Sequence, residues 1–226
     1  MQKLILILIA GTIVLSSCEK DNYDGPTAGL SGRILDAENG ELVQQDIIRG
    51  TQIEYIEHGF ANPELQYLVI KNDGTYENSL LFANTYTIRP VRGNFVDVAP
   101  QDINIGNGTV LDFTVTPYIR VKNVTIERQG SKVVARFKLQ QTVINNVKRI
   151  GLYAHQDSRV GEPMRQADAQ QDINAVTDPD HEYTLELDIS NANIFKAGMN
   201  FYFRVGALID VGEAKFNYAP AVKISL

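Results

Sequence analysis

The segment Lys132-Val133-Val134-Ala135-Arg136-Phe137-Lys138-Leu139 decides the fold class, because apolar residues occupy every second position and, apart from Val134, charged residues occupy the others. This period of two is typical of a half-buried antiparallel strand, with one face toward a core and the other toward solvent. Residues 123–127 alternate in the same way, and residues 128–131 between the two segments have the composition of a tight turn. The two segments are therefore expected to form a β-hairpin.

The same alternation recurs along most of the chain. It is found in residues 51–55, 85–89, 111–115, 150–154, 183–189, 201–207 and 221–226. Turn-forming sequences rich in Asn, Asp and Gly separate the segments, at residues 39–40, 72–74, 93–94 and 106–108. Short strands at this spacing predict an all-β chain built of antiparallel β-sandwiches.

The N-terminus has the pattern of an export signal. Lys3 precedes the apolar run 4–15, which at twelve residues is too short to span a bilayer and has the length of a signal-peptide core. The run ends in Leu15-Ser16-Ser17-Cys18, which resembles the bacterial lipobox. Residues 1–17 are therefore expected to be a lipoprotein signal peptide and Cys18 the lipidated first residue of the mature chain. Cys18 is the single cysteine, so no disulfide competes for it.

Residues 18–28 read as an acidic, turn-rich tether without apolar periodicity. The acidic cluster resembles the surface-export signal of Bacteroidetes lipoproteins. This resemblance implies a lipid-anchored protein on the outer face of the outer membrane; a periplasm-facing outer-membrane lipoprotein is the alternative. Without Lys3, the mature chain has 20 basic and 27 acidic residues, a net charge of −7. A nucleic-acid partner is therefore not expected.

Residues 29–116 are expected to form the first sandwich. The order of its features resembles a carboxypeptidase-regulatory-like, transthyretin-like domain: a Gly-x-Ile first strand, an Asp-to-Gly turn, an Asp-Gly-x-Tyr hairpin and a Tyr-x-Ile strand. The matching segments are residues 30–36, 39–43, 52–55, 72–76 and 86–88. The sequence departs from the family pattern in two places: the middle is expanded at residues 58–64, and the usual small-residue strand opening is absent near residues 47–50. These departures concern the local loop geometry and not the fold.

Residues 117–226 are expected to form the second sandwich, because a fresh series of alternating segments follows Pro117. Six or seven strands, with the aromatic-rich segment 201–207 next to last, resemble an immunoglobulin-like or fibronectin-III-like domain. The whole chain resembles a two-domain Bacteroidetes lipoprotein family of unknown function whose genes lie beside SusC/SusD-type uptake systems. This resemblance implies a non-catalytic accessory that binds glycan for polysaccharide uptake. The alternative is a structural or assembly subunit that docks protein partners of the uptake complex.

The residues themselves carry no recognisable catalytic pattern. The three histidines, His58, His155 and His181, lie far apart, and no metalloprotease, nucleophile-elbow or phosphate-loop motif is present. We therefore expect no enzyme activity and no cofactor.

Glycan recognition usually relies on aromatic rings that stack on sugar C–H groups. The chain has no tryptophan, so the candidates are aromatic residues expected in exposed loops: Phe60, Tyr67, Phe95, Phe216 and Tyr218. For each of them, packing onto its own domain is the competing interpretation.

A stretch of about 27 residues, 156–182, is expected to be a long loop rich in carboxylates. Long connections are often functional, and clustered carboxylates can ligate Ca²⁺. The candidate ligands are Asp168, Asp172, Asp178 and Asp180, although their spacing matches no known calcium loop and solvated acidic loops are common.

Overall fold

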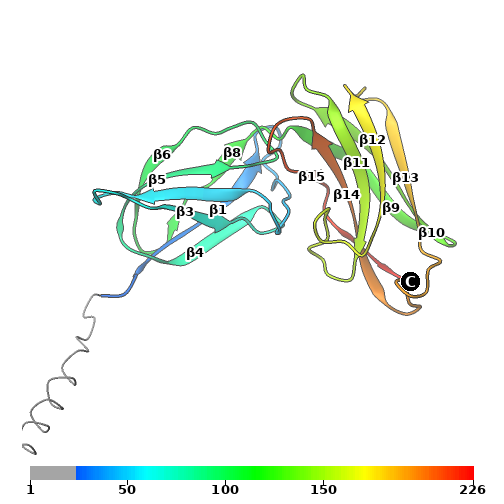
Figure 1. Ribbon diagram of the computed structural model, residues 1–226, viewed down its shortest axis with the longest axis horizontal. Coiled ribbons are helices and arrows are strands. Elements are labelled where there is room, and N and C mark those ends of the chain that lie inside the picture. The colour runs from blue at the N-terminus through cyan, green and yellow to red at the C-terminus, as the bar shows by residue number, and fades with distance from the viewer. Residues whose placement is uncertain (1–23) are drawn as a thin grey trace, which may run out of the picture.

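The computed structural model describes residues 24–226, which fold into two domains arranged end to end (Figure 1). In this part of the chain, all of the regular secondary structure is β-strand. The prediction of an all-β chain with two sandwich domains is therefore confirmed. Within residues 24–226, no helix has the length and hydrophobicity needed to cross a membrane.

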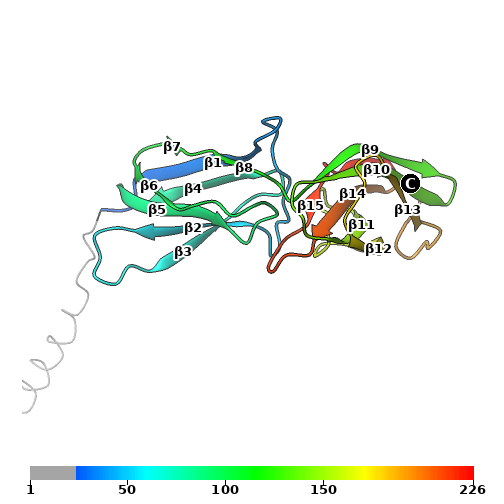
Figure 2. The ribbon, with the colours of Figure 1, turned by 90° about the horizontal axis from the view of Figure 1, so that it is seen from above.

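The first domain packs two sheets against each other (Figure 2). One sheet has the order β4-β1-β7, with β8 also paired to β1, and the other has the order β3-β2-β5-β6. The strands are β1 Ala28–Asp36, β2 Gln52–Glu57, β3 Leu65–Val69, β4 Thr75–Leu81, β5 Asn84–Val91, β6 Gln101–Ile105, β7 Thr109–Val110 and β8 Phe113–Val115. In β1 every second residue is fully buried, so the period of two places one face of the strand in the core.

The second domain has the same two-layer plan with a different strand order. A three-stranded sheet β13-β10-β9 faces a five-stranded sheet β12-β11-β14-β15, with β16 also paired to β14. The strands are β9 Ile119–Gln129, β10 Lys132–Gln141, β11 Val147–His155, β12 Ala167–Ala175, β13 Glu182–Asp188, β14 Asn200–Ile209, β15 Asn217–Tyr218 and β16 Val222–Ser225. The expected hairpin joins β9 to β10, and Gly130 takes a positive φ of 63° in its turn.

The structure corrects the prediction of a long loop at residues 156–182. Strand β12 occupies Ala167–Ala175 within that stretch and pairs with β11. Its sequence is small and polar because β12 lies at the edge of the sheet, where few of its side chains are buried. An edge strand of this kind lacks the apolar alternation by which the other strands were predicted.

Candidate functional site

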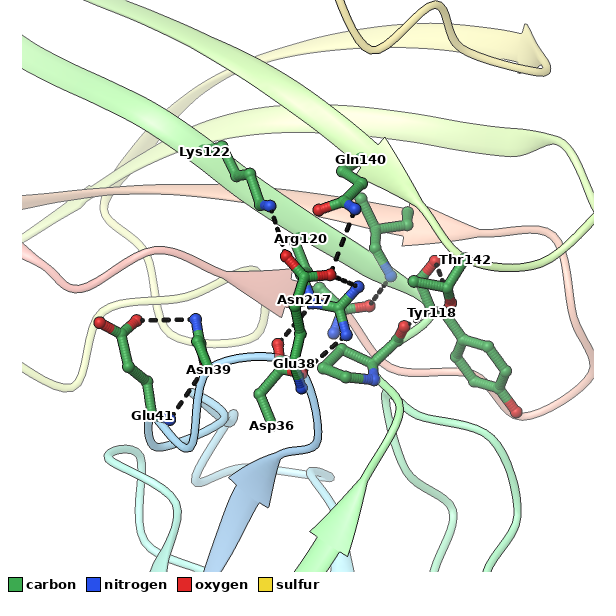
Figure 3. A network of polar contacts seen from close by, with 12 residues as sticks. Asp36, Glu38, Asn39, Glu41, Tyr118, Arg120, Lys122, Gln140, Thr142 and Asn217 are labelled. Atoms are coloured by element: carbon green, nitrogen blue, oxygen red, sulfur yellow. Dashed lines mark hydrogen bonds and ion pairs between the residues drawn. The ribbon is translucent and has the colours of Figure 1, made fainter.

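A groove of about 320 Å³ runs between the two domains, where the segment after β1 faces β9 (Figure 3). We call it the interdomain groove. Its first-domain wall is Asp36 and Asn39 with residues 41–44, and its second-domain wall is Pro117 with residues 119–123 and 217–220. The groove therefore exists only because the two sandwiches meet at this angle.

An ion pair closes the floor of the interdomain groove. Arg120 on β9 donates through Nε to Oδ2 of Asp36 at 2.6 Å and through Nη2 to Oδ1 at 2.7 Å. Both side chains are less than a tenth exposed, and the two parallel hydrogen bonds fix the orientation of each partner. Burial alone would raise the pKa of Asp36, but the hydrogen bonds from Arg120 and the backbone of Glu38 outweigh it and hold that pKa below its usual value.

Glu38 extends this contact along the rim (Figure 3). Its carboxylate lies 2.8 Å from Nη1 of Arg120 and accepts hydrogen bonds from Nζ of Lys122 at 2.8 Å and Nε2 of Gln140 at 3.2 Å. The hydrogen bond from Lys122 is the main reason that the pKa of Glu38 lies below its usual value. Asp36 and Glu38 thus hold the walls of the groove in place.

Asn39 and Glu41 are the polar side chains best placed to receive a ligand. Both are exposed on the first-domain wall, and Nδ2 of Asn39 donates to Oε2 of Glu41 at 3.2 Å. Oδ1 of Asn39 also accepts a hydrogen bond from the backbone N–H of Glu41 at 2.9 Å, and each side chain keeps further hydrogen-bonding capacity. Opposite them, the exposed Pro220 contributes apolar surface, whereas Ile119 is buried in the core of the second domain. The groove therefore offers planar polar groups on one side and apolar atoms on the other.

A β-bulge in β9 extends the groove. Asn123 has a φ of 53°, and Asn123 and Val124 together lie opposite Phe137 of β10. Bulges of this kind redirect side chains and are common beside functional sites. Beyond the bulge lies a second hollow of about 380 Å³, which shares Lys122 and Asn123 with the interdomain groove.

Gln140 lies in this second hollow. Its Oε1 is buried and accepts no hydrogen bond from any described residue.

Behind the groove, Arg204 of β14 joins the two domains. Its side chain is fully buried and donates hydrogen bonds to the carbonyl oxygens of Gln45 at 3.0 Å and Asn72 at 3.3 Å and to Oε1 of Gln44 at 3.2 Å. Its guanidinium also lies 4.2 Å from the ring centroid of Tyr218. A guanidinium in this position connects three separate points of the first domain to the second.

Asp46 and Tyr218 make a second buried contact across the junction. The Tyr218 hydroxyl donates to Oδ2 of Asp46 at 2.9 Å and accepts a hydrogen bond from the backbone N–H of Glu162 at 2.8 Å. Burial raises the pKa of Asp46 to about 7. The carboxyl group is therefore neutral in a substantial fraction of molecules near neutral pH.

The structure corrects the expected exposure of three aromatic candidates, since Phe95, Phe216 and Tyr218 are all buried. Phe95 forms a β-bridge with Pro117 at the domain junction. Phe216 and Tyr218 pack against the ring of Tyr153. Contacts between segments distant in sequence cover these rings.

The other two aromatic candidates, Phe60 and Tyr67, are exposed. Phe60 lies in the loop between β2 and β3, whereas Tyr67 lies within strand β3 rather than in a loop. Arg92 lies 5.6 Å from the Tyr67 ring centroid. Neither ring lines the interdomain groove.

The structure does not gather the four candidate calcium ligands into a site. Asp168 and Asp172 lie on β12 and pair with Arg165 and Arg149, respectively. Asp178 accepts a hydrogen bond from the backbone N–H of Asp180 in the following turn. Across residues 24–226, no group of three or more His, Cys, Asp or Glu side chains is arranged to hold a metal ion. Strand formation separates these carboxylates and gives two of them arginine partners.

The predicted signal peptide, residues 1–17, and the predicted lipidation site, Cys18, lie outside the described residues.

Two family models match nearly the whole of the described chain. The model described as the N-terminal domain of a protein of unknown function, DUF3823, matches residues 28–116, and the model described as the DUF3823_C domain of unknown function matches residues 119–223. The chain belongs to the DUF3823 family. A two-domain family of unknown function was expected from the sequence, and this expectation is confirmed.

Solved structures of DUF3823 relatives share the fold. A "putative carbohydrate binding protein" from Bacteroides uniformis is 36% identical, with a TM-score of 0.79, and the match covers 89% of this chain and 100% of that chain. A DUF3823 protein from Bacteroides ovatus is 25% identical, with a TM-score of 0.75 and coverage of 88% and 100%. One from Parabacteroides merdae, 24% identical, has a TM-score of 0.76 and coverage of 89% and 100%. No curated protein matches this DUF3823 chain.

The sequence did not single out the polar residues of the groove. Asp36 and Arg120 lie near strand ends 84 positions apart, and only the fold brings them together. Asn39 was assigned to a turn, which is correct, but the turn sequence does not reveal that it faces a second domain.

Proposed function

We propose that this chain is a non-catalytic accessory lipoprotein of the outer-membrane surface that binds glycan in the interdomain groove. The observation that carries the proposal is the groove itself, with the polar side chains of Asn39 and Glu41 on one wall and the exposed apolar ring of Pro220 on the other. Sugars have both hydroxyl groups and apolar C–H faces. A site for them therefore combines planar hydrogen-bonding groups with apolar surface.

The relative from Bacteroides uniformis supports this choice of ligand. It is described as a putative carbohydrate binding protein, and the match covers all of that chain at 36% identity. Because the match spans both domains, the relative also has the two sandwiches whose meeting creates the groove.

The carboxylates of the groove are better suited to a binding site than to a catalytic site. The two carboxylates on its floor and rim, Asp36 and Glu38, are held in ion pairs with Arg120 and Lys122. Ion pairing lowers the pKa of both carboxyl groups, whereas a general acid needs a pKa raised toward neutrality.

The location rests on the N-terminal sequence. Leu15-Ser16-Ser17-Cys18 is the lipobox-like segment, and acidic residues follow it. Several acyl chains on Cys18 would hold the protein firmly, since each buried CH₂ contributes about 0.8 kcal/mol. We place the protein beside a SusC/SusD-type uptake complex, as its family resemblance suggests.

Calorimetric titration against a panel of bacterial, plant and host polysaccharide fragments tests the glycan site. We expect residues 19–226 to bind at least one glycan, and the double variant Asn39→Ala/Glu41→Ala to weaken binding at least tenfold, or about 1.4 kcal/mol. Asn107→Ala, which removes an exposed amide far from the groove, is the matched control and should bind like the wild type. Unchanged affinity in the double variant would exclude the groove as the binding site.

A further inference from the structure

Four large apolar side chains are exposed at one end of the first domain. The exposed fractions are 62% for Phe60, 46% for Leu65, 72% for Leu80 and 51% for Phe82. Phe60 lies in the β2–β3 loop, Leu65 begins β3, and the other two lie at the end of β4 and just after it. We call these four residues the apolar tip.

Hydrogen bonds hold the two segments of the apolar tip together. Asn84, which follows Phe82 closely, donates through Nδ2 to the carbonyl oxygen of His58 at 2.9 Å and to Oε1 of Glu57 at 3.0 Å. The hydroxyl of Tyr86 donates to the carbonyl oxygen of Phe82 at 3.0 Å. The exposed rings are therefore carried on loops that the sandwich fixes in place.

The apolar tip lies where the chain enters the first domain, at the end farthest from the second domain (Figures 1 and 2). Ala28, the first residue of β1, is directly opposite Leu81 of β4 in the sheet. Nine residues separate Cys18 from Ala28, and the ten steps of the backbone between them can span at most about 36 Å. A lipid anchor on Cys18 would thus keep this end close to the membrane.

The charges around the apolar tip suit an uncharged lipid surface. Residues 58–66 and 77–84, which carry the tip, contain no Lys or Arg, and their only acidic residues are Glu64 and Glu77. Apolar contact, rather than attraction to anionic headgroups, would therefore supply the binding energy.

We propose that the apolar tip inserts into the interfacial layer of the membrane that holds Cys18. The proposal rests on the lipid-anchor part of the proposed function and is independent of glycan binding. Aromatic and aliphatic side chains are favoured at the boundary between headgroups and acyl chains. The short tether raises the local concentration of the tip at the lipid surface, so that even weak insertion is largely populated.

The composition of the chain allows a clean test, because it contains no tryptophan and one cysteine. Mature protein, residues 18–226, is coupled through Cys18 to a maleimide lipid in phosphatidylcholine vesicles, which supplies the anchor regardless of native lipidation. Phe60→Trp and Phe82→Trp each place a single fluorophore in the tip. Ile144→Trp, at a residue 94% exposed in the second domain, is the matched control.

On tethering, the emission of both tip variants should shift to shorter wavelength, and brominated phosphatidylcholine should quench it, while the control shows neither change. Leu80→Ser in the Phe60→Trp background should reduce the quenching. The proposal is overturned if the tip variants behave like the control. Changes in tip fluorescence on adding glycan or a protein partner, but not lipid, would assign the tip to that ligand instead. If the Cys18→Ala variant stays in the membrane fraction of cells, the proposed lipid anchor on Cys18 is contradicted, but the insertion of the apolar tip is not.

Discussion

Arg204 shows how one buried side chain fixes the geometry on which the groove depends. Arg204→Met keeps similar bulk but removes the donors that satisfy carbonyl groups of both domains. Because buried acceptors are costly to leave unpaired, we expect unfolding free energy to fall by about 3–5 kcal/mol in denaturant titrations. Arg128→Met, at an exposed arginine, should change it by less than about 0.5 kcal/mol. A loss below about 1 kcal/mol for Arg204→Met would contradict this account of the junction.

Asp46 should make the folded protein less stable as pH rises, the opposite of the usual effect of a carboxyl group. Its pKa is raised from 3.8 to about 7 in the folded protein, so between these values the native state binds more protons than the unfolded state. The contribution of Asp46 to the free energy of unfolding is therefore fully present below about pH 4 and is lost as pH rises through 7. The expected loss is on the order of 4 kcal/mol.

The pH effect of Asp46 is measured as a difference, because carboxyl groups with lowered pKa, such as Asp36, give the opposite trend in acid. Asp46→Asn resembles the protonated side chain and cannot titrate. We expect the stability of this variant relative to the wild type to increase from pH 4 to pH 7 in denaturant titrations. Parallel stability profiles for the two proteins would show that Asp46 does not titrate in this range.

At the scale of the strand, the bulge in β9 shapes the groove through the left-handed backbone of Asn123. Asn123→Gly should leave stability within about 0.5 kcal/mol of the wild type, because glycine adopts positive φ without strain. Asn123→Val should cost about 1–2 kcal/mol, since a β-branched residue is strained there. Thr125→Val, at an exposed position nearby on β9, is the control and should be neutral. Thermal or chemical unfolding measures all three, and equal costs for the glycine and valine variants would contradict the strain.

Strands were predictable from sequence where one face is buried. The alternation in β10 directly reflects the core that it lines, and the Gly130 turn gives its hairpin. Strand β12 was not predictable, because an edge strand with few buried side chains has no apolar period. The burial of Phe216 and Tyr218 was missed for a related reason: packing of their segment against Tyr153 depends on the tertiary fold, not on local sequence.

In the whole molecule, strand β1 connects the two surfaces to which we assign a role. It begins at Ala28 beside the apolar tip and ends at Asp36 in the interdomain groove. Its nine residues span about 30 Å. A protein whose tip rests on lipid would therefore hold the groove that far from the membrane, where a polysaccharide has access to it.

Polar contacts at the domain junction fix the orientation of the two sandwiches relative to each other. The Arg120–Asp36 ion pair lies on the groove side, and Arg204 and the Asp46–Tyr218 hydrogen bond lie behind it. Both sides of the junction are thus held by buried polar contacts, whose directionality fixes the angle between the sandwiches more narrowly than apolar contact would.

Hydrogen–deuterium exchange of residues 19–226, with and without the tightest-binding glycan of the panel, tests the central claim most directly. We expect the ligand to slow amide exchange in residues 38–44 and 119–123, on the two walls of the interdomain groove. Slower exchange confined to the apolar tip or to β3 around Tyr67, with the groove unaffected, would contradict the claim, as would the absence of binding to every glycan tested.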